Sequence, residues 1–193
     1  MAGSTLQFLW IVTIHGALDA LFADRADVFV AGDLLWYPVE GEPTIRAAPA
    51  VLVAFGRPKE HRCSYRQWKE GNIPPQVVLE VLAPGGRIEM LPKMQFYDQY
   101  GVEEFYLLDP ENADLVGYQR TEGRLREIPE MENWTSPRLG VRFERTEGEW
   151  SLLHPDGRRF VTYQELEQQR QQAQQRAERL AARLRELGED PEA

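Results

Sequence analysis

Apolar residues follow two different periods along most of this chain, and their order predicts helices that alternate with strands. Residues 6–22 carry apolar side chains at helical spacing, which predicts an amphipathic helix. Residues 88–100 predict a second helix, with Pro92 tolerated in its first turn and Gly101 as its C-terminal cap. Apolar runs predict strands at 28–37, 45–55, 76–82, 103–108, 115–119, 125–128 and 141–143. The first two strands are expected to form a hairpin, and the whole pattern is typical of an α/β (α+β) fold.

The composition changes at about Tyr163, where strong helix formers replace the mixed pattern of the preceding residues. This spacing predicts a short coiled-coil-like helix through which two copies of the chain associate as a homodimer. A solvated helix that packs on its own domain is the alternative. We therefore expect a globular domain at 1–162 and a helical tail at 163–193. The seam positions of the tail are Leu166, Ala173, Leu180 and Leu187, seven residues apart, with Ala177 and Leu184 between them.

The bulk composition is that of an ordinary soluble globular protein, and it limits the classes of function. The 193 residues are 42% hydrophobic and carry a net charge of -9. A field of this sign repels nucleic acid, so a contact with DNA needs a local positive patch. A single cysteine, Cys63, excludes an internal disulfide and a cysteine-based zinc site, and favours a reducing, cytoplasmic location. Residues 6–22 contain His15 and Asp19 and follow no basic leader, which argues against a signal peptide or a membrane span.

Glu80 stands in the middle of the otherwise apolar strand predicted at 76–82. A carboxylate at a buried strand position is costly unless a cation pairs with it. Glu89 and Lys93 lie four residues apart at the start of the next helix and therefore share one of its faces. The three side chains are expected to converge where the strand ends and the helix begins. Two interpretations stay open: carboxylates that hold Mg²⁺ or Mn²⁺, or an ion pair that only neutralises Glu80.

The segment 56–75 is polar and bracketed by Gly and Pro, which predicts a loop with one helical turn. Residues 57–71 hold five basic and two acidic side chains, with aromatic residues between them. Cations bind phosphates and aromatic rings stack on bases, so this loop predicts a nucleic-acid contact. The alternative is a solvated loop whose aromatic rings pack on the core. The predicted contact residues are Arg57, Lys59, Arg62, Arg66, Lys69, Tyr65 and Trp68.

The order of several segments resembles the putative restriction endonuclease family, a bacterial group within the PD-(D/E)XK nuclease superfamily. The resemblance covers residues 6–120 and implies a restriction-endonuclease-like mixed sheet flanked by helices. It also implies DNA as the partner, and hydrolysis of phosphodiester bonds with Mg²⁺ or Mn²⁺. The segments that carry it are AAPAVLVAFGRPK, PPQVVLEVLAPG, a helix with a lysine, and YGVEEFYLLDP.

The resemblance assigns roles to individual residues of this chain. Glu80 matches the acidic residue of the (D/E)XK half-motif, and the following helix supplies the lysine at Lys93. Glu89 matches a position that is frequently acidic in the family. The implied metal site consists of Glu80, Glu89 and the backbone carbonyl of Val81.

One departure from the family pattern bears directly on catalysis. Pro49 matches the proline of the PD pair, but Ala50 stands where its aspartate is expected. That aspartate would bind the cation, and each 1.4 kcal/mol of lost metal contribution is about tenfold in rate. The sequence therefore predicts an endonuclease-family protein with impaired hydrolysis. The alternative is a non-catalytic nucleic-acid-binding or dimeric scaffolding module that keeps the nuclease fold.

Overall fold

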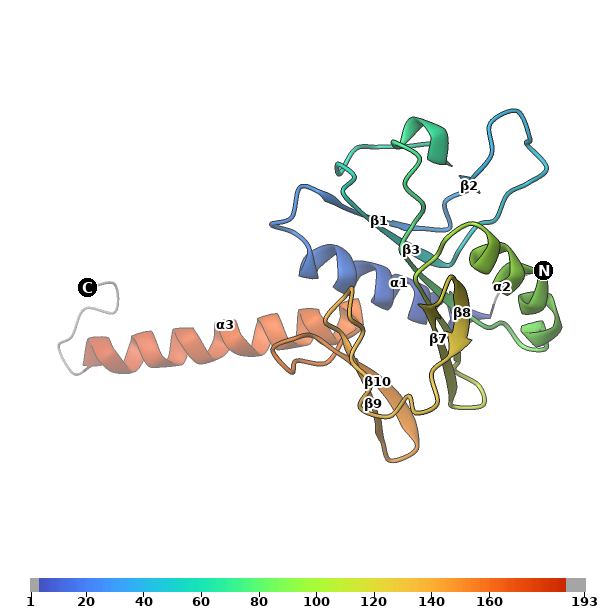
Figure 1. Cartoon of the computed structure of the whole chain (residues 1–193). Helices are drawn as coiled ribbons and strands as arrows, with labels where there is room; N and C mark the ends of the chain where they lie inside the picture. Colours follow the sequence, from blue (N-terminus) through green and yellow to red (C-terminus); the bar gives the residue numbers. More distant parts are fainter. Residues whose placement is uncertain (1–3, 187–193) are drawn as a thin grey trace. The chain divides into compact units, whose positions relative to one another are not determined.

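The computed structural model describes residues 4–186, except for the side chain of Glu89. The chain divides into two units, Met1–Phe160 and Val161–Ala193. The first unit contains a main sheet, two short strand pairs and the helices α1 and α2 (Figure 1). The second unit contains helix α3 (Tyr163–Glu186).

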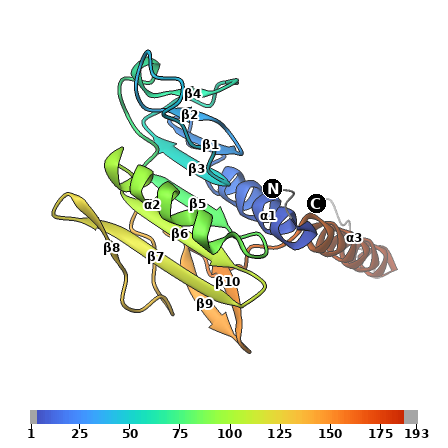
Figure 2. The ribbon, with the colours of Figure 1, turned by 90° about the vertical axis from the view of Figure 1, so that its right-hand side faces the viewer.

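The main sheet has the strand order β1-β3-β5-β6-β7-β8. Strands β5 and β6 are parallel and the other neighbours are antiparallel, so the sheet is mixed. A parallel pair needs a long crossover connection, and here η2 (Gly86–Glu89) and α2 (Met90–Gln99) supply it. Figure 2 shows α2 lying over β5 and β6. The strands are β1 (Val28–Gly32), β3 (Val51–Phe55), β5 (Val77–Val81), β6 (Glu104–Asp109), β7 (Asp114–Thr121) and β8 (Arg124–Glu127).

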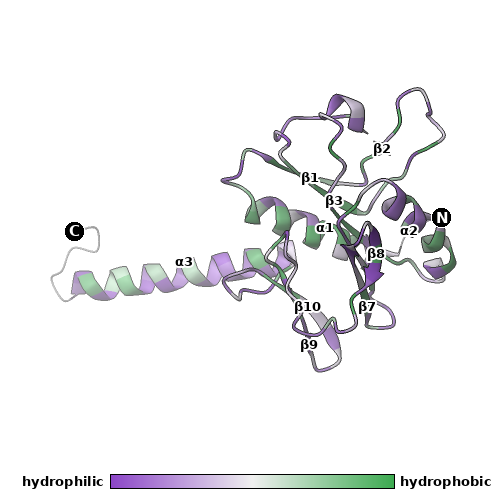
Figure 3. Ribbon diagram, viewed as in Figure 1, coloured by the Kyte–Doolittle hydropathy of each residue, from purple (hydrophilic) through white to green (hydrophobic). Residues whose placement is uncertain are grey.

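Each face of the main sheet carries its own apolar layer, because side chains alternate along a strand. On one face, α1 (Thr5–Leu21) packs through Ile14 and Leu18, together with Leu79 of β5. On the other face, Val78 of β5 packs with Tyr97 of α2. Figure 3 shows that α1 is mostly hydrophobic along its length. The position of Glu80, two residues after Val78, places its side chain on the α2 face.

Two short strand pairs complete the first unit. Strands β2 (Trp36–Tyr37) and β4 (Tyr65–Arg66) are parallel, and η1 (Gln67–Lys69) follows β4. Strands β9 (Arg142–Thr146) and β10 (Glu149–Leu153) form an antiparallel pair. The pair β2–β4 contributes to the core on the α2 face, and β9–β10 contributes to the core on the α1 face.

The structure corrects two of the predicted strands and adds strands that the sequence did not predict. Residues 28–37 are not one strand, because β1 ends at Gly32 and Asp33 takes a positive φ of 48° that turns the chain away. The strand expected at 45–55 begins only at Val51, so β1 and β3 pair as predicted but without a tight hairpin turn. Strand β10 was not predicted. The predicted helices at 6–22 and 88–100 and the strands at 76–82 and 103–108 are confirmed within a few residues.

Helix α3 has no buried residue, and apolar side chains of its predicted seam are exposed. Leu166 and Leu180 are 53% and 57% exposed. Leu187, which continues the seam, lies outside the described residues. The coiled coil therefore stays a prediction. Within residues 4–186, no helix is both long and apolar enough to cross a membrane.

Candidate active site

The side chain of Glu80 is almost completely buried, at 3% exposure, on the α2 face of β5. Its Oε1 atom accepts hydrogen bonds from Nζ of Lys93 at 2.7 Å and from the hydroxyl of Tyr97 at 2.5 Å. Nζ of Lys93 also donates to the carbonyl of Ala48 at 3.1 Å. A buried carboxylate is tolerated only when it is paired and hydrogen-bonded. Lys93 and Tyr97 together meet that requirement.

The geometry of α2 explains why two of its side chains reach the same carboxylate. Lys93 and Tyr97 are four residues apart and lie on one face of the helix. Gly101, at a φ of +92°, ends the helix, and the N–H of Val102 donates to the carbonyl of Tyr97 at 3.1 Å. This is the hydrogen bond of a glycine-terminated helix end. The predicted cap at Gly101 is confirmed, and it ends the helix about two turns beyond Lys93.

The position expected to carry an aspartate lies beside Glu80. The backbone N–H of Ala50, which directly precedes β3, donates to Oε2 of Glu80 across 3.4 Å. The structure thus brings residues 50, 80 and 93 into one place, as the sequence predicted. A methyl group stands where the family pattern has a carboxylate.

The backbone carbonyl of Val81, at the end of β5, has a partner that the sequence did not predict. Nε2 of Gln7 donates to this carbonyl at 2.6 Å. Gln7 lies in the first turn of α1, where its own N–H donates to the side chain of the N-cap residue Ser4 at 3.0 Å. The contact joins positions 74 residues apart in sequence. No spacing rule predicts it, because it depends on how α1 packs against the sheet.

Tyr97 is a second residue that sequence reasoning missed. Burial raises the pKa of its hydroxyl well above the ordinary value, and the charge of Glu80 raises that pKa further. Tyr97 therefore stays protonated and acts as a hydrogen-bond donor to Glu80. Its spacing of one helical turn from Lys93 is the signal that could have identified it.

The donors around Glu80 determine whether a divalent cation fits this site. Mg²⁺ and Mn²⁺ need several oxygen ligands with free lone pairs. Within the described part of the chain, no three His, Cys, Asp or Glu side chains lie close enough together to hold a metal ion. Glu89 ends η2, but its side chain lies outside the described part. Both oxygens of Glu80 and the carbonyl of Val81 also accept protein hydrogen bonds, so the described residues do not offer the set of ligands that the cation needs.

Three of the five basic side chains predicted to bind nucleic acid have acidic partners. Arg62 pairs with Glu70 at 2.7 Å, and Arg57 lies 3.7 Å from the same carboxylate. Lys59 lies 3.5 Å from Asp19 of α1. These pairs reduce the positive charge that the loop offers to a phosphate.

Tyr65 belongs to the core of the structure. It is fully buried, its hydroxyl donates to the carbonyl of Ile73 at 2.8 Å, and its ring stacks on Phe29 with centroids 6.2 Å apart. Burial also raises the pKa of its hydroxyl. A ring in this position is not presented to a base, so the alternative of aromatic packing describes Tyr65.

Arg66, Trp68 and Lys69 are placed differently from the rest of the predicted set. Arg66 and Trp68 line a groove of about 450 Å³, together with Leu35 and Tyr37. Arg66 and Lys69 are exposed, and neither makes an ion pair with any residue in the range 4–186. These two cations are therefore the ones most available to a phosphate backbone.

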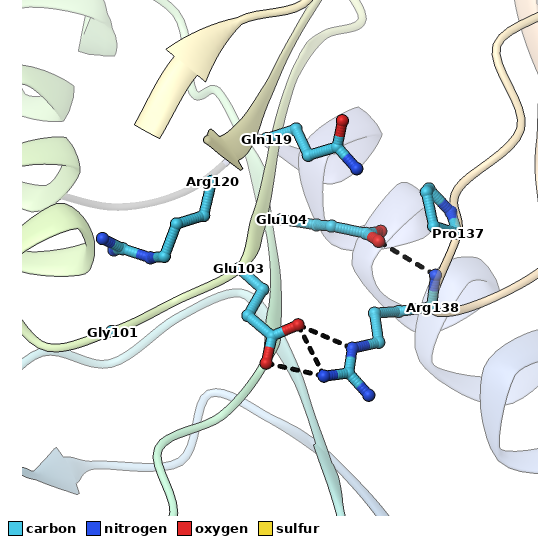
Figure 4. A pocket seen from close by; sticks show the side chains of 7 residues that line it. All are labelled: Gly101, Glu103, Glu104, Gln119, Arg120, Pro137 and Arg138. Carbon is cyan, nitrogen blue, oxygen red and sulfur yellow. Dashed lines mark hydrogen bonds and ion pairs between the residues drawn. The ribbon is translucent and has the colours of Figure 1, made fainter. Parts of the chain in front are cut away.

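A second buried carboxylate, Glu104 at the start of β6, belongs to a different part of the molecule. It accepts hydrogen bonds from the hydroxyl of Tyr106 at 2.9 Å, from the N–H of Arg138 at 2.9 Å, and from the hydroxyl of Ser136. Figure 4 shows it in a pocket of about 580 Å³, beside the ion pair of Glu103 and Arg138. Tyr106 packs in the core on the α1 face, so Glu104 and Glu80 lie on opposite faces of the sheet. Burial raises the pKa of Glu104, and its three donors give it a structural role.

Comparison with known proteins identifies the family. Residues 10–146 match the model of Uma2, described as "Putative restriction endonuclease". The chain belongs to the Uma2 family. The matched range includes Ala50, Glu80 and Lys93, so this candidate site lies inside the part of the chain that is typical of Uma2 proteins.

A solved structure supports the fold of this Uma2 protein. The crystal structure of a putative nuclease belonging to DUF820 from Anabaena variabilis ATCC 29413 is similar, with a TM-score of 0.52. The two chains are 12% identical over 71% of this chain and 74% of the other. At that identity the likeness shows the fold alone, and it confirms the predicted mixed sheet flanked by helices. Among curated proteins, none matches the chain.

Proposed function

We propose that this Uma2 protein acts on DNA through the site of Glu80 and Lys93, and that residue 50 impairs its hydrolysis of phosphodiester bonds. The supporting observation is the short distance between Ala50 and Glu80. The N–H of Ala50 lies 3.4 Å from one oxygen of Glu80, and Nζ of Lys93 lies 2.7 Å from the other. An aspartate at position 50 would add a second carboxylate directly beside the first.

Lys93 supplies the charge of this site, and Glu80 and Ala48 hold it in position. The side chain of Lys93 is 31% exposed, whereas that of Glu80 is 4% exposed, so Lys93 is the charge that a phosphate can reach. Glu80 and the carbonyl of Ala48 hold the ammonium in place. In nucleases with an intact site, a divalent cation supplies an activated water and neutralises phosphate charge. The methyl group of Ala50 can neither bind a ligand nor take a proton, so we expect slow cleavage.

The contact with DNA is proposed to continue onto the groove beside the strand pair β2–β4. Arg66 and Lys69 would bind phosphates, while Trp68 and Tyr37 offer aromatic surface to an unstacked base. The net charge of -9 opposes association, so binding should weaken steeply as salt is raised.

A plasmid-nicking assay with the variant Ala50→Asp tests this proposal at saturating Mn²⁺. We expect the variant to cut faster than the unmodified chain, by an amount up to roughly a thousandfold, because 4 kcal/mol of transition-state stabilisation corresponds to about that factor. The control Ala50→Asn has nearly the same shape but no charge, and should stay slow. Adding Glu80→Ala to the aspartate variant should abolish the gain. Equal rates for the aspartate and asparagine variants would contradict the assignment of residue 50.

A second candidate function is a non-catalytic nucleic-acid-binding or dimeric scaffolding module that keeps the nuclease fold. The observation that favours it is the set of hydrogen bonds around Glu80, in which each carboxylate oxygen already has at least one donor from the protein. Under this alternative, the aspartate variant in the nicking assay would still bind DNA in EDTA but would not cut it in Mn²⁺. The leading proposal expects cutting.

A further inference from the structure

The carbonyl of Val81 lacks a backbone partner on the side of β3. Strands β3 and β5 pair in the register Val51 with Leu79, so residue 49 would stand opposite Val81 two positions further along. That residue is Pro49, which has no N–H to donate. A carbonyl left this way at the end of a buried strand needs another donor. In this chain the donor is Nε2 of Gln7, at 2.6 Å.

Gln7 supplies a hydrogen where a cation would need an oxygen. The family resemblance assigns the Val81 carbonyl to the metal, beside Glu80. An amide N–H that points at this carbonyl places a positive end at the same oxygen, and it opposes a cation there. The same holds at Glu80, where Lys93, Tyr97 and the N–H of Ala50 all donate.

We propose that Gln7 is a metal-excluding residue. Its amide donates a hydrogen bond to the Val81 carbonyl, so hydrogen-bond donors of the protein occupy this site and it does not hold Mg²⁺ or Mn²⁺. The inference rests on the proposed function, because it uses the same site. It goes beyond that proposal, because it makes Ala50 only one of two causes of lost metal binding. Restoring the aspartate alone gives a weak site, and removing the amide as well gives a stronger one.

The test measures Mn²⁺ binding directly, by the loss of the free Mn²⁺ signal in electron paramagnetic resonance, without any nuclease assay. The unmodified chain, Ala50→Asp, Ala50→Asp with Gln7→Ala, and Ala50→Asp with Gln7→Glu are compared. We expect no binding by the unmodified chain and weak binding by the single variant. Either change at Gln7 should then tighten binding by about tenfold or more, the size typical of groups that tune a metal ligand.

Two controls separate this effect from charge and from folding. Gln99→Glu in the Ala50→Asp background adds the same charge at an exposed position of α2 and should leave the affinity within about twofold. Thermal unfolding of each variant without metal shows that it is folded. Gln7→Ala removes a hydrogen bond, whereas Gln7→Glu keeps the side-chain length, so the two variants should affect the stability of the fold differently.

The outcomes distinguish this inference from the proposed function. If Ala50→Asp binds Mn²⁺ equally well with and without Gln7, Gln7 does not exclude the metal, and the nuclease site stands. If Gln7→Ala weakens binding, the amide oxygen of Gln7 turns to serve as a ligand, and the inference is wrong. If none of the four proteins binds Mn²⁺, both the inference and the assignment of the site fail.

Discussion

Glu80 is the residue on which the candidate site depends, because its charge is buried and its side-chain partners, Lys93 and Tyr97, come from another element. Lys93 compensates that charge directly, with Nζ at 2.7 Å from Oε1. Removing one partner of a buried ion pair leaves an uncompensated charge, which costs far more than loss of an exposed pair.

The variant Lys93→Met tests this dependence on a single residue. We expect it to lower the free energy of unfolding by about 3–5 kcal/mol, because Glu80 is left charged in the core or must take up a proton. The control Lys59→Met removes a longer pair with Asp19, and should cost less than about 1 kcal/mol. Urea unfolding followed by circular dichroism measures both. Similar losses for the two variants would mean that Glu80 is solvated in solution.

At this scale, the sequence identified the residues whose type is unusual for their position and missed those whose role depends on packing. A carboxylate in an apolar strand and a lysine on the next helix were predicted to lie close together, and they form an ion pair. The contact of Gln7 with Val81 could not be predicted, because it depends on how α1 packs against the sheet, whereas Tyr97 was missed although its helical spacing from Lys93 pointed to it. Tyr65 shows the converse, since an aromatic residue among cations proved to be core.

At the scale of elements, strong periodicity gave the right answer and interrupted periodicity did not. Helix α1 and strands β5 and β6 lie close to their predicted ranges because long apolar patterns set them. Residues 33–35 and 45–50 were assigned wrongly to regular strands. The turn at Asp33 and the pairing of β2 with the distant β4 are tertiary effects that local composition does not encode.

Glu104 connects β6 to the segment before β9 and gives a prediction about pH. Since burial raises its folded-state pKa, the stability it contributes is present below its unfolded pKa and is lost as pH rises through the folded pKa. The variant Glu104→Gln cannot ionise, so its stability relative to the unmodified chain should increase as the pH rises above about 4, the unfolded pKa of a glutamate. Urea midpoints across that range measure the difference. Glu111→Gln, at an exposed position, is the control, and an equal pH slope in both variants would contradict the prediction.

At the scale of the whole molecule, we predict self-association through α3. This helix has no buried residue, and a row of exposed leucines along it is stabilised when a second helix covers it. Figure 3 shows hydrophobic and hydrophilic residues alternating along α3.

Deleting residues 164–193 should reduce the mass measured by light scattering to less than half, because the second copy and the tail are both lost, and should leave a folded first unit. Leu180→Glu, which places a charge in the predicted seam, should act in the same direction. Gln174→Glu adds the same charge outside the seam and should leave the mass unchanged. If the full chain already has the mass of a monomer, the predicted homodimer is wrong.

Pro49 has a consequence for how activity could be gained or lost in such a fold. Because a proline has no N–H to donate, the hydrogen bonds between β3 and β5 end at Pro49 whatever side chain follows at position 50. The end of this strand pairing is thus determined by the main chain. Exchange of one or two side chains beside Pro49 would therefore change the activity of the site without changing the backbone that supports it.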